Sequence, residues 1–355
     1  MKRKVSIAIA GCTGAVGREA ISILNKRSVL QHFGEIDLRL FASASSSGLN
    51  VTFHGESYPV CLLEERSLIE NPADVVLFTA GSEVSRKLAP PAAKAGSIVI
   101  DNSSAFRMSP DVPLIIPEIN AHLLADIPPG EGAIIANPNC STILLAVVTF
   151  PLACRFGIEH MVVSTYQAVS GAGAAAMQEL QQQTQNILAG QKATPRIFTE
   201  PCAFNVFSHD SAVDVQTGLN EEESKIIKEM KKIFSSSPST LNTPGITCTC
   251  IRVPVFRAHC ESVNLAFSKP VTVAEIRETL KQAPSVTLRD DRQQNDFPTP
   301  LKAENRDEVF AGRIRLDPSR NDNRGADLFL CGDQLRKGAA LNALQIAEII
   351  LRNRI

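Results

Sequence analysis

The chain has 355 residues, with 36 Lys and Arg against 37 Asp and Glu, and a formal net charge of −1. This length allows two domains with sizeable cores. The balanced charge provides no electrostatic footprint for nucleic acid or an anionic membrane surface. No apolar run reaches transmembrane length. Nine scattered cysteines without a Cys-x-x-Cys pair predict neither a disulfide framework nor a metal site, and a reducing cytoplasm fits them best.

The first part of the chain alternates short apolar strands with helices. Such alternation predicts a parallel sheet with both faces covered by helices. The predicted strands are Val5–Ala10, Ile36–Phe41, Val75–Ala80 and Ser97–Asp101, and the predicted helices run from about Ala15 to Lys26 and from about Ser85 to Ala95.

A glycine-rich loop joins the first strand to the first helix. Gly11, Gly14 and Gly17 stand three residues apart in it. Glycines allow a tight turn and close approach of a phosphate, and the helix N-terminus supplies N–H groups for a pyrophosphate. The pattern predicts dinucleotide binding in this position, with a simple packing turn as the alternative.

The second predicted strand ends in a serine-rich segment, Phe41 to Gly48. This segment has no carboxylate to bind a ribose 2′-hydroxyl, which weakens the case for NAD. Serine hydroxyls and main-chain amides could hold a 2′-phosphate instead, so NADP is favoured. The alternative is a serine loop that contacts no ligand.

The pattern changes in the second part of the chain. Longer strands with alternating polarity predict an α+β domain whose sheet is open on one face, and such a sheet often pairs with a second subunit, so we expect a homodimer. The last helix is apolar on most sides and is expected to return to the first domain. The predicted elements are strands His160–Val169 and Thr247–Val255, helices Ala174–Leu188, Glu221–Phe234 and about Leu335–Arg352, a linker Ser235–Ser239 and a loop Asp290–Asn305.

Cys140 follows the turn-forming Asn137-Pro138-Asn139 and directly precedes Ser141, Thr142 and an apolar helical run. This places a thiol at a predicted helix N-terminus. Free N–H groups and the positive end of the helix dipole favour a thiolate there, and the same groups could stabilise an oxyanion. The alternative is a small buried residue beside a turn.

Six short segments, in this order and spacing, carry a family resemblance: Gly11–Gly17, Asp101–Met108, Asn137–Thr142, Gln167–Gly173, Arg252–Val255 and Leu335–Ala340. Through them the chain resembles the aspartate-semialdehyde dehydrogenases nearly end to end. The resemblance implies a Rossmann-like NADP-binding domain of residues 1–139 with 334–355. It also implies an α+β catalytic and dimerisation domain of residues 140–333.

The resemblance also implies the site residues. Cys140 would be the nucleophile, His259 the acid/base, and Gln167 would orient the substrate. Arg107 and Lys225 would hold phosphate, Glu222 the substrate amino group and Arg252 its α-carboxylate. The implied cofactor-binding residues are Gly11, Thr13, Gly14, Ala15, Val16, Ser43, Ser45, Ser170, Gly171 and Gln334.

The residue types suit the implied chemistry. Reduction of an acyl phosphate through a thioester needs a nucleophilic thiol and a proton-transferring group, usually His. Of the six histidines, His259 follows the strand that carries Arg252. Without the resemblance, Arg107 reads as a surface arginine, Gln167 as a satisfied polar residue, and Glu222 with Lys225 as an ordinary solvated helix face.

The implied reaction is the NADPH-dependent conversion of 4-aspartyl phosphate to L-aspartate 4-semialdehyde and phosphate, which feeds lysine, diaminopimelate, threonine and methionine synthesis. The nearest alternative is an N-acetyl-glutamyl-phosphate reductase, in which an aromatic residue commonly follows the cysteine; here Ser141 follows. The other alternative is a catalytically silent nucleotide-binding relative, which would lack the thiol or the histidine. The chain departs from many relatives at Ser45, where they carry arginine, and at Gln334, where they carry asparagine.

Overall fold

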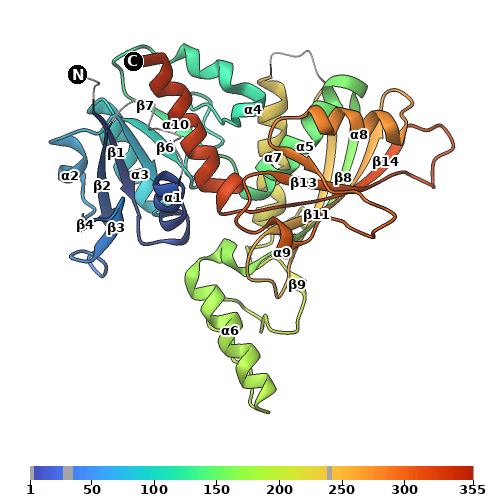
Figure 1. The fold of residues 1–355 in the computed structure, drawn as a ribbon, viewed down its shortest axis with the longest axis horizontal. Coiled ribbons are helices and arrows are strands. Elements are labelled where there is room, and N and C mark those ends of the chain that lie inside the picture. The colour runs from blue at the N-terminus through green and yellow to red at the C-terminus, as the bar shows by residue number, and fades with distance from the viewer. Residues whose placement is uncertain (1–3, 27–34, 238–241, 355) are drawn as a thin grey trace. The chain divides into compact units, whose positions relative to one another are not determined.

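The computed structural model describes residues 4–26, 35–237 and 242–354 (Figure 1). The chain folds into two compact units, one of residues 1–139 with 339–355 and one of residues 140–338. Part of the predicted linker Ser235–Ser239 lies outside the described residues. None of the described helices is both long and apolar enough to cross a bilayer.

The first unit is built on a seven-stranded sheet with the order β3-β4-β2-β1-β5-β6-β7. Its strand pairs are parallel except for the antiparallel pair of β3 and β4. The predicted parallel sheet is therefore confirmed. The strands are β1 Val5–Ala10, β2 Ile36–Ala42, β3 Asn50–Phe53, β4 Glu56–Leu62, β5 Val75–Phe78, β6 Ile98–Asp101 and β7 Ala133–Ala136.

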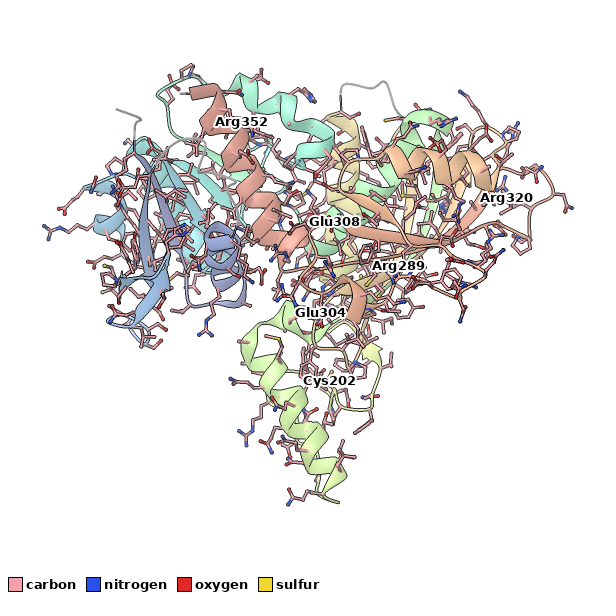
Figure 2. All side chains as sticks on the ribbon, viewed as in Figure 1. Cys202, Arg289, Glu304, Glu308, Arg320 and Arg352 are labelled. Atoms are coloured by element: carbon pink, nitrogen blue, oxygen red, sulfur yellow. The ribbon has the colours of Figure 1, made fainter. Side chains whose placement is uncertain are left out.

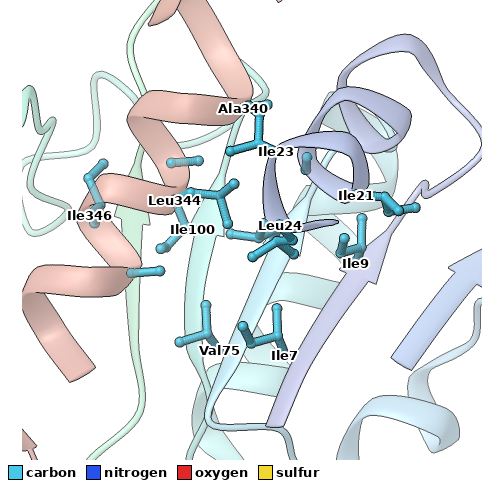
Figure 3. Packing of buried hydrophobic residues seen from close by; sticks show 14 of the residues in the cluster. Ile7, Ile9, Ile21, Ile23, Leu24, Val75, Ile100, Ala340, Leu344 and Ile346 are labelled. Carbon is cyan, nitrogen blue, oxygen red and sulfur yellow. The ribbon is translucent and has the colours of Figure 1, made fainter. Parts of the chain in front are cut away.

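Helices cover both faces of this sheet. Side chains of β1 alternate between the faces, as the strand period of two requires: Ile7 and Ile9 pack with α1 (Ala15–Lys26) and α10 (Leu341–Arg354), as Figure 3 shows. Ala8 and Ala10 pack with α3 (Ser82–Lys94) on the other side. The predicted return of the last helix to the first domain is thus confirmed. Smaller elements are α2 Glu65–Ile69, α4 Pro117–Asn120 and η2 Ala121–Asp126.

Two predicted helix starts were wrong. Helix α3 begins at Ser82, three residues before the predicted start, and it contains Pro90 and Pro91. The last helix was expected from Leu335, but a π-helical turn, η4 (Arg336–Ala340), comes first and the α-helix begins at Leu341. A π-turn has no residue pattern of its own that separates it from an α-helix, so the sequence does not distinguish them.

The second unit is built on a mixed seven-stranded sheet with the order β12-β13-β14-β11-β8-β10-β9. Strand β8 lies between β11, which is antiparallel to it, and β10, which is parallel to it. The strands are β8 Ile158–Gln167, β9 Phe207–Ser208, β10 Gly245–Arg252, β11 His259–Phe267, β12 Val286–Leu288, β13 Val309–Leu316 and β14 Gly325–Gly332.

Helices α5 (Cys140–Phe156), α7 (Glu221–Ser235) and α8 (Val273–Gln282) pack on this second sheet. On β8 the alternate side chains Val162 and Tyr166 are 45% and 39% exposed, so one face is open, as predicted. The predicted loop at 290–305 was wrong in part, because α9 occupies Pro300–Ala303. The 3-10 turn η3 (Val169–Ala172) precedes α6 (Ala174–Leu188), beside which Cys202 packs (Figure 2).

Candidate active site

Helix α5 begins at Cys140, as the sequence predicts. The run Ile143–Val148 behind it is buried and anchors the helix in the second unit. Cys140 itself is only partly buried. The π-turn η4 packs closely on it: a Cβ on Gly338 would lie 3.0 Å from the Cβ of Cys140. A glycine is therefore needed where the turn passes the thiol-bearing residue.

Gln167, at the end of β8, links the start of α5 to α7. Its Nε2 donates to Ser141 Oγ at 2.9 Å and to Glu222 Oε1 at 3.1 Å. Gln167 is almost fully buried, and its Oε1 has no hydrogen-bonding partner among the described residues. Gln167 Oε1 is therefore available to accept a hydrogen bond close to Ser141, the residue that follows Cys140.

The main chain of Ala168 holds two predicted site residues. Its N–H donates to Nδ1 of His259 at 3.0 Å, and its carbonyl oxygen accepts from Nη1 of Arg252 at 2.8 Å. A Cβ on Gly171 would lie 3.4 Å from the His259 ring and 3.5 Å from Arg252 Nη1. The turn η3 therefore packs its main chain directly against both side chains.

His259 is buried and neutral. Burial, followed by the nearby Arg252 guanidinium, lowers its pKa to about 3. Because Nδ1 accepts the Ala168 N–H, the proton of the neutral ring is assigned to Nε2. The resting side chain is consequently a neutral hydrogen-bond donor at Nε2.

Arg252 also contacts three residues that the sequence did not single out. Nε and Nη2 donate to Asp210 Oδ1 at 3.1 and 2.8 Å, and Nη2 lies 2.9 Å from His209 Nε2. The guanidinium also lies over the ring of Phe198, 5.3 Å from its centroid. No sequence motif marks these residues. His209 and Asp210 directly follow β9, and they come close to Arg252 because β9 pairs with β10 in the folded chain.

Glu222 and Lys225 share one face of α7, as predicted. Asn220 caps this helix through a capping box with Glu223, which fixes the helix start. Lys225 Nζ lies 3.6 Å from Glu222 Oε2. Glu222 is buried whereas the Lys225 side chain is 30% exposed. Of the two, only Glu222 differs from the solvent-exposed side chain that the charge pattern of this helix would predict.

Ser170 and Gln334 lie together in the second unit. Gln334 Nε2 donates to Ser170 Oγ, and Gln334 Oε1 accepts from the N–H of Ala258 at 2.8 Å. Ala258 precedes His259 and has a positive φ of 72°. Gln334 thereby holds the backbone that leads into β11.

The glycine loop borders a cavity of about 800 Å³ in the first unit, lined by Gly11, Thr13, Gly14 and Ser43 among others. A Cβ on Gly17 would lie 2.4 Å from the Gly11 oxygen, so helix α1 can begin this close only with glycine. Ser45 is outside the lining but its Oγ lies 2.9 Å from that of Ser43. The cavity, the loop and the helix N-terminus fit a dinucleotide.

Two basic residues that the sequence did not single out, Arg66 of α2 and Lys87 of α3, also line this cavity. They come from segments far from the serine loop in sequence. Ala15 and Val16 begin α1, and Val16 packs partly against the core.

Arg107, also in the first unit, is buried, and it donates to the main-chain oxygens of Asn137 at 2.9 Å and Asn102 at 2.8 Å. Asn137 stands three residues before Cys140 in the chain. Arg107 is therefore not the surface arginine that its loop position alone would predict.

Beside His259 in sequence, β11 carries two unusual residues. Cys260 Sγ lies 3.2 Å from Cys331 Sγ on the neighbouring β14. Glu261 is fully buried, and neither of its carboxyl oxygens has a hydrogen-bonding partner within the described part of the chain. Among the described residues, no group of three or more His, Cys, Asp or Glu side chains is arranged to hold a metal ion.

Comparison with known proteins identifies two family models in the chain. The semialdehyde dehydrogenase NAD-binding domain matches residues 6–127, and the semialdehyde dehydrogenase dimerisation domain matches residues 150–337. The predicted fold class is thereby confirmed, and the first domain binds NAD(P).

Full-length relatives are similar throughout. Aspartate-semialdehyde dehydrogenase of Synechocystis sp. is 44% identical over 351 residues, 99% of this chain and 98% of the relative. That of Bacillus subtilis strain 168 is 41% identical and covers 98% of each chain. The crystal structure of aspartate semialdehyde dehydrogenase II from Vibrio cholerae, complexed with ASA, superposes with a TM-score of 0.90 at 38% identity, covering 99% of this chain and all of that one.

We expect Glu261→Gln to raise the free energy of unfolding at neutral pH. Burial raises the pKa of Glu261 well above its ordinary value of 4.5, so the folded state retains a proton that the unfolded state releases. The stability tied to this proton is complete below pH 4.5 and is lost as pH rises toward the folded pKa. The gain should therefore vanish near pH 4, as measured by denaturant unfolding between pH 4 and 8.

Glu179→Gln is the matched control. Glu179 is also buried, but its oxygens accept from Gln183 Nε2 and from the main-chain N–H groups of Arg196 and Ile197. Loss of these charge-assisted bonds should destabilise the protein by about 1–3 kcal/mol at neutral pH. A comparable loss in Glu261→Gln would contradict a protonated Glu261.

Proposed function

Because the chain belongs to the aspartate-semialdehyde dehydrogenase family, we propose that it converts 4-aspartyl phosphate to L-aspartate 4-semialdehyde and phosphate, with Cys140 as nucleophile and NADPH as reductant. The observation that carries this proposal is the position of Cys140 at the start of α5, next to a residue bonded to Gln167. The product would feed lysine, diaminopimelate, threonine and methionine synthesis. All nine cysteines are free thiols, in keeping with a cytoplasmic location.

In this mechanism the Cys140 sulfur attacks the acyl carbon and phosphate leaves, which gives a thioester on the enzyme. Bound NADPH would supply the hydride that reduces this thioester. The N-terminal N–H groups of α5 favour the thiolate and stabilise negative charge on the attacked oxygen.

His259 acts as a hydrogen-bond donor in this proposal. Its Nε2–H can stabilise the oxyanion by donating a hydrogen bond to it. A neutral donor suits this task because it avoids placing a second full positive charge beside Arg252. Gln167 keeps Ser141 in position and offers its free Oε1 to the substrate.

Four further residues suit the charged ends of the substrate. Arg252 has the planar fork that binds a carboxylate, and Glu222 can accept from the substrate ammonium. Lys225 and Arg107 would bind phosphate. In this assignment residues 1–139 with 334–355 bind NADP, and residues 140–333 carry catalysis and dimerisation. We assign Ser170, Gly171 and Gln334 to cofactor binding as well.

Two alternatives receive less support. An N-acetyl-glutamyl-phosphate reductase would commonly carry an aromatic residue where this chain has Ser141, whose hydroxyl bonds Gln167. A catalytically silent relative would lack the thiol or the imidazole, and this chain retains Cys140 and His259.

We further propose that NADP is preferred over NAD, although Ser45 replaces the arginine of many relatives. The hydroxyls of Ser43 and Ser45 are adjacent, and Arg66 and Lys87 line the same cavity as Ser43. Arg66 pairs with Glu70 at 2.6 Å in an exposed position, and such a pair is weak enough to yield to a phosphate dianion.

We propose a homodimer that forms through the open face of the second sheet. Val162 and Tyr166 expose apolar surface there, and Tyr166 packs against Phe329 of β14 at a ring separation of 6.2 Å. A second copy covering this face would bury these side chains.

Cys140→Ala should reduce turnover by more than about a thousandfold, because it removes the nucleophile and leaves the rest of the site. The assay is oxidation of L-aspartate 4-semialdehyde with phosphate and NADP, followed as reduced nicotinamide absorbance. Coenzyme binding should persist. Cys154→Ala, an exposed thiol on the same helix, is the control; retained turnover in Cys140→Ala would remove this residue from its role.

Arg66→Ala should weaken binding of 2′,5′-ADP about tenfold and leave binding of 5′-AMP unchanged, because only the first ligand has a 2′-phosphate. Calorimetry measures both. Lys87→Ala should act in the same direction, whereas Arg86→Ala, exposed on the same helix but outside the cavity, should have no effect. Equal losses for both nucleotides would rule out a phosphate contact.

Tyr166→Asp should shift the protein from dimer to monomer in light scattering, because it places a charge in the apolar interface. Leu49→Asp, exposed in the first unit, provides the control. A dimer that persists in Tyr166→Asp would place the interface elsewhere.

A further inference from the structure

The guanidinium of Arg252 is nearly saturated with partners inside the second unit. Of its five N–H groups, one on Nη1 donates to Ala168, and Nε and one on Nη2 donate to Asp210, whereas the other on Nη2 faces the His209 ring, whose Nε2 lies 2.9 Å from Nη2. This leaves one N–H, on Nη1. A carboxylate held by both oxygens needs two parallel N–H groups, so no such pair is available.

The partners differ in how easily they could leave. Ala168 offers a main-chain oxygen at the end of a central strand. The Asp210 side chain is 25% exposed whereas that of Arg252 is 3% exposed. Asp210 stands just beyond the two-residue strand β9, on a segment attached to the sheet through few hydrogen bonds. Asp210 is therefore the outermost partner of the guanidinium.

The charges show which of these partners is an anion. Burial opposes ionisation of Asp210, but the Arg252 guanidinium outweighs it and lowers the pKa of this carboxyl. Burial lowers the pKa of His209, so this ring adds no charge. Glu222 and Lys225 are the other charged groups near His209. Asp210 is thus the anion that neutralises Arg252.

We propose that Asp210 occupies the position that the substrate carboxylate takes on Arg252, and that the substrate binds by displacing it. The inference rests on the proposed function, in which Arg252 receives the α-carboxylate. Asp210 then acts as an internal competitor. The apparent substrate affinity is reduced in proportion to the fraction of molecules in which Asp210 has left the Arg252 guanidinium. It also keeps a buried guanidinium paired when no substrate is present.

The test is Asp210→Asn, which keeps the shape of the side chain and removes its charge. The KM for L-aspartate 4-semialdehyde should fall about fivefold, while kcat and the KM for phosphate stay constant. L-Aspartate, which has the same α-carboxylate and α-ammonium groups without a reactive carbonyl, should bind more tightly by a similar factor in calorimetry. Asp210→Ala should change both quantities in the same direction.

Asp214→Asn is the matched control on the same segment. Asp214 Oδ1 accepts from the N–H groups of Gln216 and Thr217, bonds that asparagine keeps, so its KM should match the unmodified enzyme. A higher KM in Asp210→Asn would mean that Asp210 positions Arg252 for the substrate, and it would overturn the proposal. An unchanged KM would also overturn it. Absence of turnover in the unmodified enzyme would instead contradict the proposed function. The affinities of the unmodified protein and of Asp210→Asn for L-aspartate would then test whether Asp210 competes for Arg252.

Discussion

The hydrogen bonds of Ala168 are the constraint on which the candidate site depends. This residue, which directly follows β8, donates its N–H to His259 and offers its carbonyl oxygen to Arg252. Because Ala168 lies directly between the last residue of β8 and the turn η3, its main-chain groups are held in place and fix both side chains. The register supplies the rest: Arg252 pairs with Gln167 across β10 and β8, and β11 begins at His259. The positions of His259 and Arg252 thus follow from the pairing of β8 with β10 and from the main-chain hydrogen bonds of Ala168.

The same bond decides what His259 can do. An imidazole whose Nδ1 accepts a main-chain N–H must carry its proton on Nε2, and burial beside Arg252 keeps it neutral. A buried cation next to a second cation would be costly. Glu261, two residues along β11, is also kept uncharged by burial. The strand therefore brings two titratable groups into the interior in their neutral forms, and charge is concentrated on Arg252, Asp210, Glu222 and Lys225.

The sequence predicted features with local causes. The strand, glycine loop and helix of residues 5–26 and the helix start at Cys140 follow from periodicity, glycines and turn residues, and the structure confirms both. Features with non-local causes were missed. His209 and Asp210 reach Arg252 because β9 pairs with β10, and Arg66 joins the cavity beside the glycine loop because β4 lies beside β2. Neither pairing leaves a periodic signal. The π-turn at Arg336–Ala340 was missed because no residue pattern separates it from the first turn of an α-helix.

The first unit is discontinuous in sequence, and this has a consequence for synthesis on the ribosome. Residues of α10, among them Leu344 and Ile346, belong to the same apolar cluster as β1 and α1. The part of this sheet face that α10 covers therefore stays exposed until the polypeptide has been translated beyond residue 340. The inserted unit of residues 140–338 is complete before that point and can fold first. The 139 residues before it meanwhile keep isoleucines and valines exposed. Chaperone demand during translation should accordingly be concentrated on the N-terminal segment.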